Sequence, residues 1–120
     1  MKVLKSFRYA INGIKYCYKH ELNFRIHLLL MVVVIVMGFI FTINTTEWLF
    51  VIGCCMLVLS LELLNTAIEN ICNLLSKNFN PFIKIIKDAA AGAVLVTAIG
   101  SAVIGAIIFL PKIFNLIKFL

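Results

Sequence analysis

The run WLFVIGCCMLVLSLELLNTAIE, from Trp48 to Glu69, decides how this sequence folds. Residues 48–61 carry no charged side chain, and Trp48 is a residue type that favours membrane–water interfaces. A helix rises about 1.5 Å per residue, so Glu62 lies about 21 Å from Trp48, inside a hydrocarbon core roughly 30 Å thick. The run therefore predicts a membrane-spanning helix that carries a carboxylate within the bilayer.

The composition of the whole chain also indicates a lipid environment. Of the 120 residues, 63% are hydrophobic and 13% are charged, and the mean hydropathy is +1.11. A soluble domain has roughly 45–50% apolar and about 25% charged residues. A chain this short cannot bury such an excess of apolar side chains. We expect a single membrane-embedded domain over residues 1–120, because the length allows no second one.

One amphipathic segment and three apolar runs follow one another along the chain. Over residues 2–20, apolar side chains recur every three or four positions opposite a basic face. Residues 1–27 are therefore predicted to form a helical segment that lies in the membrane interface. The apolar runs predict membrane-spanning helices at about 28–43, 48–70 and 89–110, the first of them short for a span. The expected fold class is all-α, with a surface helix and three transmembrane helices.

The basic residues predict how these helices are oriented. Of the eleven Lys and Arg residues, six precede the first apolar run, three lie between residues 71 and 88, and two lie in the C-terminal tail. Cytoplasmic loops are enriched in Lys and Arg. We therefore expect the N-terminus and the 71–88 loop in the cytoplasm. A basic arm could bind nucleic acid, but anionic lipid is the simpler partner for a membrane-embedded chain, and we expect no nucleic-acid partner.

Small residues on the third span predict association between chains. Ala98, Ala102 and Ala106 repeat at every fourth position. Faces of this kind allow membrane helices to approach closely. Three thin helices enclose little interior of their own, so an oligomer is expected; the alternative is that the small residues serve packing within one chain.

Four of the five acidic residues gather at one depth of the membrane, near its predicted cytoplasmic edge: Glu21, Glu62, Glu69 and Asp88. Glu62, Asn65 and Glu69 share one helical face, because they are three and seven positions apart. A carboxylate within the bilayer is costly and usually serves a function. The structural alternatives are that Glu62 pairs with a lysine of another helix, or that it is neutral and hydrogen-bonded.

Such a cluster suits phosphoryl transfer. Mg²⁺ typically binds one or two protein carboxylates together with phosphate oxygens, and Glu21 and Glu69 are placed to bind it. Lys87 could neutralise phosphate charge, and the deeper Glu62 could accept the proton of a hydroxyl that arrives from the bilayer. The sequence has no G-x-x-x-x-G-K-[ST] motif and no Gly-rich nucleotide loop, which excludes the ordinary soluble kinase folds.

Two motifs, E-L-L-N-T-A-I-E (Glu62–Glu69) and K-D-A-A-A-G-A-V (Lys87–Val94), resemble the prokaryotic diacylglycerol kinase / undecaprenol kinase family. The segments K-S-F-R-Y-A-I-N-G-I (Lys5–Ile14) and H-E-L-N-F-R (His20–Arg25) are similar to that family's opening segments, so the resemblance covers nearly the whole chain. It implies a lipid kinase of the bacterial plasma membrane, with ATP as phosphoryl donor and Mg²⁺. It further implies a homotrimer with active sites between subunits.

The resemblance also implies roles for particular residues. Glu62 would be the general base, Asn65 its polar neighbour, and Glu21 and Glu69 the metal ligands. The expected nucleotide contacts, at the phosphates and then near the adenine, are Tyr9, Lys87, Asp88, Asn78 and Asn80. The expected contacts to the lipid substrate are Phe24, Arg25 and Glu62.

One residue departs from the family pattern. Asn73 stands where the family usually has an aspartate, four residues after Glu69. This removes one negative charge near the expected phosphates and could alter nucleotide or metal preference. The proposed base and both metal ligands are unaffected, so activity is still expected.

The short polar turn after the first span and the F-R-Y-A-I-N-G-I opening resemble the undecaprenol kinase branch of Gram-positive bacteria. The expected substrate is therefore undecaprenol, and the alternative is diacylglycerol, which would give phosphatidic acid. A non-catalytic membrane protein, such as a small pore or an assembly subunit, is a third hypothesis. It would explain the spans and the small residues, but not why the acids gather at one depth.

Overall fold

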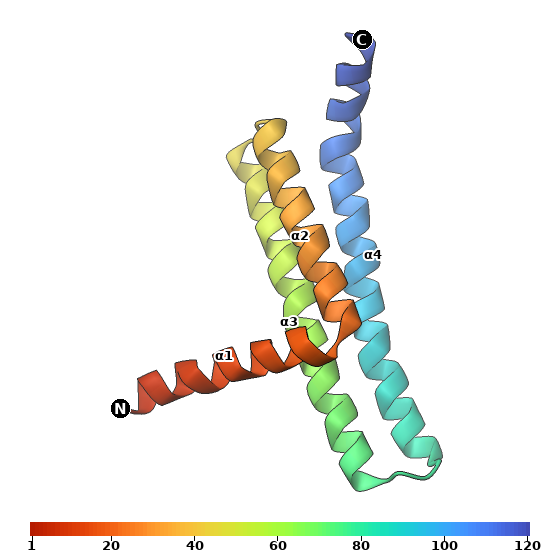
Figure 1. Ribbon diagram of the computed structural model, residues 1–120. Coiled ribbons are helices and arrows are strands. Elements are labelled where there is room, and N and C mark those ends of the chain that lie inside the picture. Colours follow the sequence, from red (N-terminus) through yellow and green to blue (C-terminus); the bar gives the residue numbers. More distant parts are fainter.

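Four helices and no strand make up the computed structural model, which describes residues 1–120. They are α1 (Lys2–His20), α2 (Leu22–Ile40), α3 (Thr45–Leu75) and α4 (Pro81–Lys118). Figure 1 shows that α2, α3 and α4 run alongside one another, whereas α1 projects sideways from the bundle. The predicted all-α fold is confirmed: an N-terminal helix is followed by three helices that are long and apolar enough to cross a membrane.

The apolar side chains of the bundle mostly face outward. Only 11 of the 120 residues are buried, although α2, α3 and α4 are each long and apolar enough to cross a membrane. Water would penalise such a surface heavily, because the hydrophobic effect favours removing apolar area from it. The surrounding solvent of these three helices is therefore lipid.

The first two helices meet at Glu21. Its extended backbone (φ −114°, ψ 111°) ends α1 and begins α2 without a glycine or proline. Helix α2 consequently includes residues 22–27 as well as the apolar run that follows them. Its 19 residues give a length of about 28 Å, close to the thickness of a hydrocarbon core.

The turn between α2 and α3 is tight and capped. The side chain of Asn44 accepts a hydrogen bond from the backbone N–H of Glu47 (2.9 Å), and the Glu47 carboxylate accepts one from the backbone N–H of Asn44 (3.1 Å). This reciprocal capping box satisfies donors that the first turn would otherwise leave unpaired. Gly38 lies directly against the indole of Trp48, where a Cβ atom would come within 2.6 Å of the ring.

The α3–α4 connection returns the chain to the bundle. Asn80 caps α4 by accepting a hydrogen bond from the backbone N–H of Phe82 (2.9 Å), and Pro81 occupies the first helical position. Proline is well suited there because the first turn needs no N–H from it. At the other end, α4 continues through Pro111 to Lys118.

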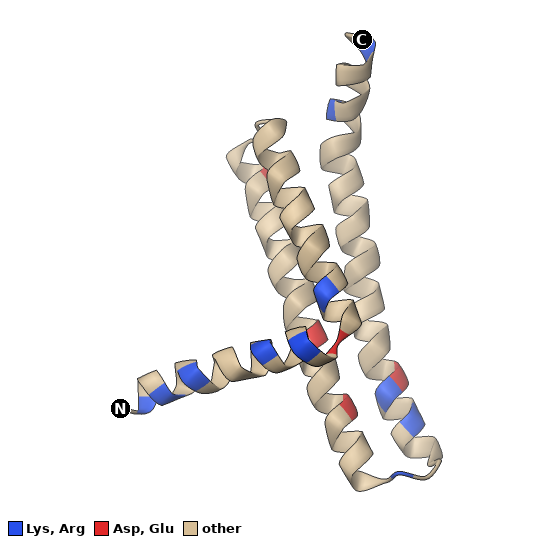
Figure 2. Cartoon of the chain, viewed as in Figure 1, with Lys and Arg blue, Asp and Glu red and all other residues tan.

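Figure 2 shows charged residues around the α1–α2 junction, on both helices near the α3–α4 loop, and near the opposite end of the bundle. Most contacts between helices join α3 to α4. Away from α1, these two helices and the turn share a small buried cluster of Ile43, Val51, Ile108 and Phe109. Apart from Glu47 in the α2–α3 turn region, the acidic residues lie near the α1–α2 junction and along the half of the α3–α4 hairpin next to its loop.

Candidate active site

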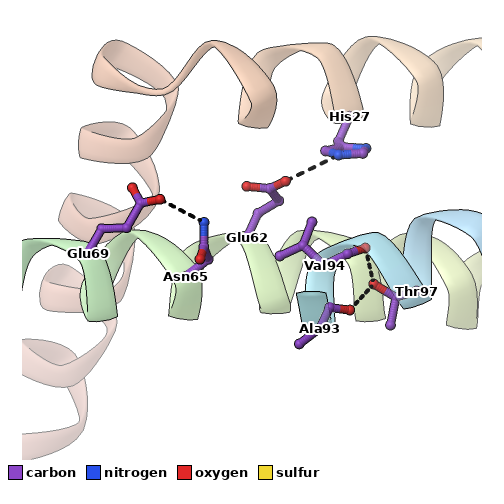
Figure 3. Close-up of polar contacts among 7 residues, drawn as sticks. All are labelled: His27, Glu62, Asn65, Glu69, Ala93, Val94 and Thr97. Atoms are coloured by element: carbon purple, nitrogen blue, oxygen red, sulfur yellow. Dashed lines mark hydrogen bonds and ion pairs between the residues drawn. The ribbon is translucent and has the colours of Figure 1, made fainter. Parts of the chain in front are cut away.

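Glu62 is a buried carboxylate held between two helices. It comes from α3 and is only 4% exposed. Its Oε1 lies 3.2 Å from Nε2 of His27 on α2, as Figure 3 shows. The partner is thus a histidine rather than the lysine that the sequence left open. His27 was missed in the sequence analysis, although the signal was present: it is the one ionisable residue at the start of the first apolar run.

Asn65 and Glu69 continue the same face of α3 (Figure 3). The amide Nδ2 of Asn65 donates a hydrogen bond to Oε1 of Glu69 at 3.3 Å. The amide oxygen of Asn65 is buried and has no hydrogen-bond partner in the chain. Buried polar atoms are normally paired, so an unpaired acceptor suggests that this atom serves a ligand.

The carboxylates of Glu21 and Glu69 each lie near enough to Glu62 for their charges to interact unfavourably with its carboxylate. The structure therefore brings together three of the four acids that the sequence placed at one depth. Like charges in a poorly solvated site are unfavourable unless a cation or proton compensates them.

The oxygen atoms at this site fit Mg²⁺. The chain contains no group of three or more His, Cys, Asp or Glu side chains that could hold a metal ion alone. Mg²⁺ does not require one, because it is usually bound by one or two carboxylates, with phosphate and water supplying the other ligands. Two carboxylates and the unpaired oxygen of Asn65 match that preference.

Asp88, the fourth acid, is paired with a lysine of its own helix. Its Oδ2 pairs with Nζ of Lys84 at 2.6 Å, one turn earlier on the exposed face of α4. Lys87 instead reaches across to α3, where its Nζ donates a hydrogen bond to Oδ1 of Asn73 at 2.7 Å. The residue that departs from the family pattern is therefore in direct contact with the lysine expected at the phosphates.

A polar cavity of about 600 Å³ lies between the end of α3 and the start of α4. Its lining has three lysines and only two hydrophobic residues, and consists of Asn73, Ser76, Lys77, Asn78, Phe79, Asn80, Ile83, Lys84 and Lys87. Lysines attract phosphate groups as point charges. Asn78, Asn80 and Lys87, all expected at the nucleotide, thus share one cavity.

The remaining predicted residues lie around the α1–α2 junction. Tyr9 is 68% exposed on α1. Phe24 is among the most buried side chains of the chain. Arg25 turns back towards α1, where its Nη1 donates to the carbonyl oxygens of Tyr18 (3.3 Å) and Lys19 (3.4 Å). In the single chain, Arg25 therefore joins the start of α2 to the end of α1.

A second, apolar cavity of about 450 Å³ lies between α2, α3 and α4. Fifteen of its eighteen lining residues are hydrophobic, and they include Met31, Val58 and Ala102. His27 belongs to its wall, so the residue that holds Glu62 also borders an apolar space. A hydrocarbon chain in this space would end close to the Glu62 carboxylate.

Comparison with known proteins gives one consistent family. Residues 8–109 match the family described as Prokaryotic diacylglycerol kinase. An "Undecaprenol kinase" of Bacillus subtilis is 41% identical over 112 residues, which cover 93% of this chain and 91% of that protein. A "Diacylglycerol kinase" of Synechocystis is 37% identical over 95% of this chain and 66% of that protein. A "Diacylglycerol kinase" of Helicobacter pylori is 31% identical over 95% of this chain and 89% of its own length.

Proposed function

The chain belongs to the prokaryotic diacylglycerol kinase family and is a membrane-embedded lipid kinase that uses ATP, and we propose that its substrate is undecaprenol. The product would be undecaprenyl phosphate. The observation that carries this choice is the 41% identity to the Bacillus subtilis undecaprenol kinase over nearly the full length of both chains. Diacylglycerol is the second candidate, because the relatives at 37% and 31% identity bear that name.

The proposed reaction is a transfer of the γ-phosphoryl group to the lipid hydroxyl. The hydroxyl oxygen forms a bond to the γ-phosphorus, and the bond from that phosphorus to the bridging β–γ oxygen breaks. The electron pair of the broken bond leaves with ADP. The hydroxyl proton passes to a carboxylate oxygen of Glu62, which has the burial and the depth suited to a hydroxyl that stays near the bilayer.

The other residues of the cluster bind and orient the phosphates in this proposal. Lys87, with Tyr9 and Asp88, contacts the phosphate groups, and Asn78 and Asn80 lie near the adenine. Glu21 and Glu69 hold Mg²⁺, which when bound neutralises charge on the phosphate oxygens. Asn65 orients Glu69 through the hydrogen bond between them.

We also propose a homotrimer with the active site on the cytoplasmic side. Gly92 and Gly100 on α4 have open space where a Cβ atom would point, which leaves room for the close approach of a neighbouring chain. The basic helix α1 joins the bundle in the half that ends at the α3–α4 loop (Figure 2), and Lys77, Lys84 and Lys87 lie in this loop and the start of α4; basic segments favour the cytoplasm. Phe24 and Arg25 would contact the lipid substrate in this assembly.

The test is phosphate transfer from labelled ATP in detergent micelles that contain either undecaprenol or diacylglycerol. Greater transfer to undecaprenol is the expected result. Greater transfer to diacylglycerol would reverse the substrate assignment and leave the lipid kinase intact. The absence of any phosphorylated lipid with both substrates would contradict the proposed function.

A further inference from the structure

We propose that His27 is the positioning residue of the catalytic carboxylate: from α2, it fixes the orientation of Glu62 on α3. This inference rests on the proposed function, because it takes Glu62 as the base. His27 lies outside the Glu62–Glu69 motif, on a different helix and 35 positions before Glu62 in the chain.

The geometry is specific to one atom pair. His27 Nε2 and Glu62 Oε1 are 3.2 Å apart, and the two side chains are 20% and 5% exposed. No other hydrogen bond or ion pair engages Glu62, so Oε2 is available to accept the hydroxyl proton while Oε1 is held. A group that abstracts a proton must be held within hydrogen-bond reach of it, and small displacements are costly.

The other polar side chains near Glu62 are engaged elsewhere, including Asn65, whose Nδ2 donates a hydrogen bond to Glu69. Glu21 and Glu69 repel the carboxylate. Arg25 is occupied by the carbonyl oxygens at the end of α1. On α4, the hydroxyl of Thr97 is directed to the carbonyl oxygens of Ala93 and Val94 in its own helix (Figure 3). His27 is therefore the side chain whose nitrogen contacts the Glu62 carboxylate in this structure, and this contact can keep Glu62 in one orientation.

The position of His27 also links the base to the apolar cavity. Its imidazole lines the cavity between α2, α3 and α4 while contacting Glu62. The cavity is open enough for hydrocarbon and otherwise offers few polar contacts. The pair thus lies where an apolar space meets the acid cluster, which is where the hydroxyl of a lipid must be aligned.

The experiment compares His27→Leu, which removes the donor, with His27→Gln, which keeps one. In the full-length protein, we expect His27→Leu to lower kcat for lipid phosphorylation on the order of 10-fold to 100-fold. The KM for ATP should stay within about twofold, because the nucleotide cavity is lined by other residues. His27→Gln should recover most of the lost kcat. The matched control is His20→Gln, since His20 is the only other histidine and bonds to its own helix at the Tyr16 carbonyl.

A second measurement does not depend on activity. In protein labelled with ¹⁵N at histidine, Glu62→Gln should shift the imidazole nitrogen resonances of His27 and leave those of His20 unchanged. Unchanged His27 resonances, or wild-type kcat in His27→Leu, would overturn the proposal. Equal loss of kcat in His27→Leu and His27→Gln would also overturn it, because a merely structural role predicts no rescue.

Failure of the proposed function gives a different pattern. If Glu62→Gln retains turnover, Glu62 is not the base, whatever His27 does. If Glu62→Gln is inactive and His27→Leu is fully active, the base stands and only the role of His27 is lost.

Discussion

The carboxylate at the start of α3 and those farther along this helix have opposite electrostatic surroundings. At the start of the helix, Glu47 completes the capping box with Asn44 and lies 3.3 Å from Nζ of Lys112 on α4. Farther along the helix, Glu62 lies near the carboxylates of Glu21 and Glu69, and the amide oxygen of Asn65 is buried without a partner. The first end is electrostatically complete within the chain, whereas the second gains most from a cationic or phosphate-bearing ligand.

This difference separates stability from function along one helix. Near Glu47, the buried apolar cluster and the tight α2–α3 turn hold the helices together. Near Glu62, the buried residues include the polar Glu62 and Thr66, and two further carboxylates lie close to Glu62. Residues at the first end should affect unfolding, and residues at the second should affect turnover. Four predictions test this separation.

The largest effect is expected from Glu62→Gln. The amide is similar in size but cannot accept the hydroxyl proton, so turnover should fall on the order of 10²-fold to 10⁴-fold. The measurement is transfer of labelled phosphate from ATP to lipid, with circular dichroism and size-exclusion chromatography to verify the fold and oligomer. The matched control is Glu47→Gln at the other end of α3, which should keep its turnover. Full activity in Glu62→Gln would make the buried carboxylate a structural group.

The next largest effect concerns Mg²⁺. Glu21→Ala and Glu69→Ala each remove one carboxylate from the proposed metal site. We expect each variant to need on the order of 10-fold to 100-fold more Mg²⁺ for half-maximal activity. Titrations of activity against Mg²⁺ at saturating ATP provide the measurement. A titration curve that coincides with the wild type would remove that residue from the metal site.

The sequence was sufficient to predict the spans and the face of α3 that carries Glu62, Asn65 and Glu69. Hydropathy and the helical period depend only on local sequence, and neither depends on how the helices pack against one another. The partner of Glu62 was not predictable in the same way. It depends on the register of α2 against α3, which the close contact of Gly38 and Trp48 helps to set.

The partners of the lysines were likewise not predictable from the sequence. The sequence places Lys87 beside Asp88, but adjacent residues on a helix point in different directions. In the structure, Asp88 pairs with Lys84 one turn away, and Lys87 reaches Asn73 across the α3–α4 hairpin. Which lysine serves which partner is thus decided by the path of the loop between the helices.

Gly38→Ala is expected to act at the stable end. The new Cβ would lie 2.6 Å from the ring of Trp48, which also packs against Phe39 at a centroid distance of 4.9 Å. Overpacking of this kind should lower the free energy of unfolding by about 1–3 kcal/mol. Unfolding in detergent micelles measures this free energy. Gly53→Ala is the control, because nothing lies within 4 Å of its added Cβ. Equal stability of the two variants would contradict a tight α2–α3 turn.

The smallest effect is expected from Lys112→Met, which leaves Glu47 with its capping contacts but without its cation. The pair is partly exposed, with the side chains of Lys112 and Glu47 30% and 21% accessible, so solvent weakens the attraction. The melting temperature should fall only slightly, while kcat and the KM for ATP should match the wild type. Lys87→Met removes the same charge from the other end and should instead raise the KM for ATP, because Lys87 lines the polar cavity. An equal change of the KM for ATP in Lys112→Met and Lys87→Met would contradict the functional separation of the two ends of α3. A charge remote from the polar cavity would then contribute as much to nucleotide binding as a charge that lines it.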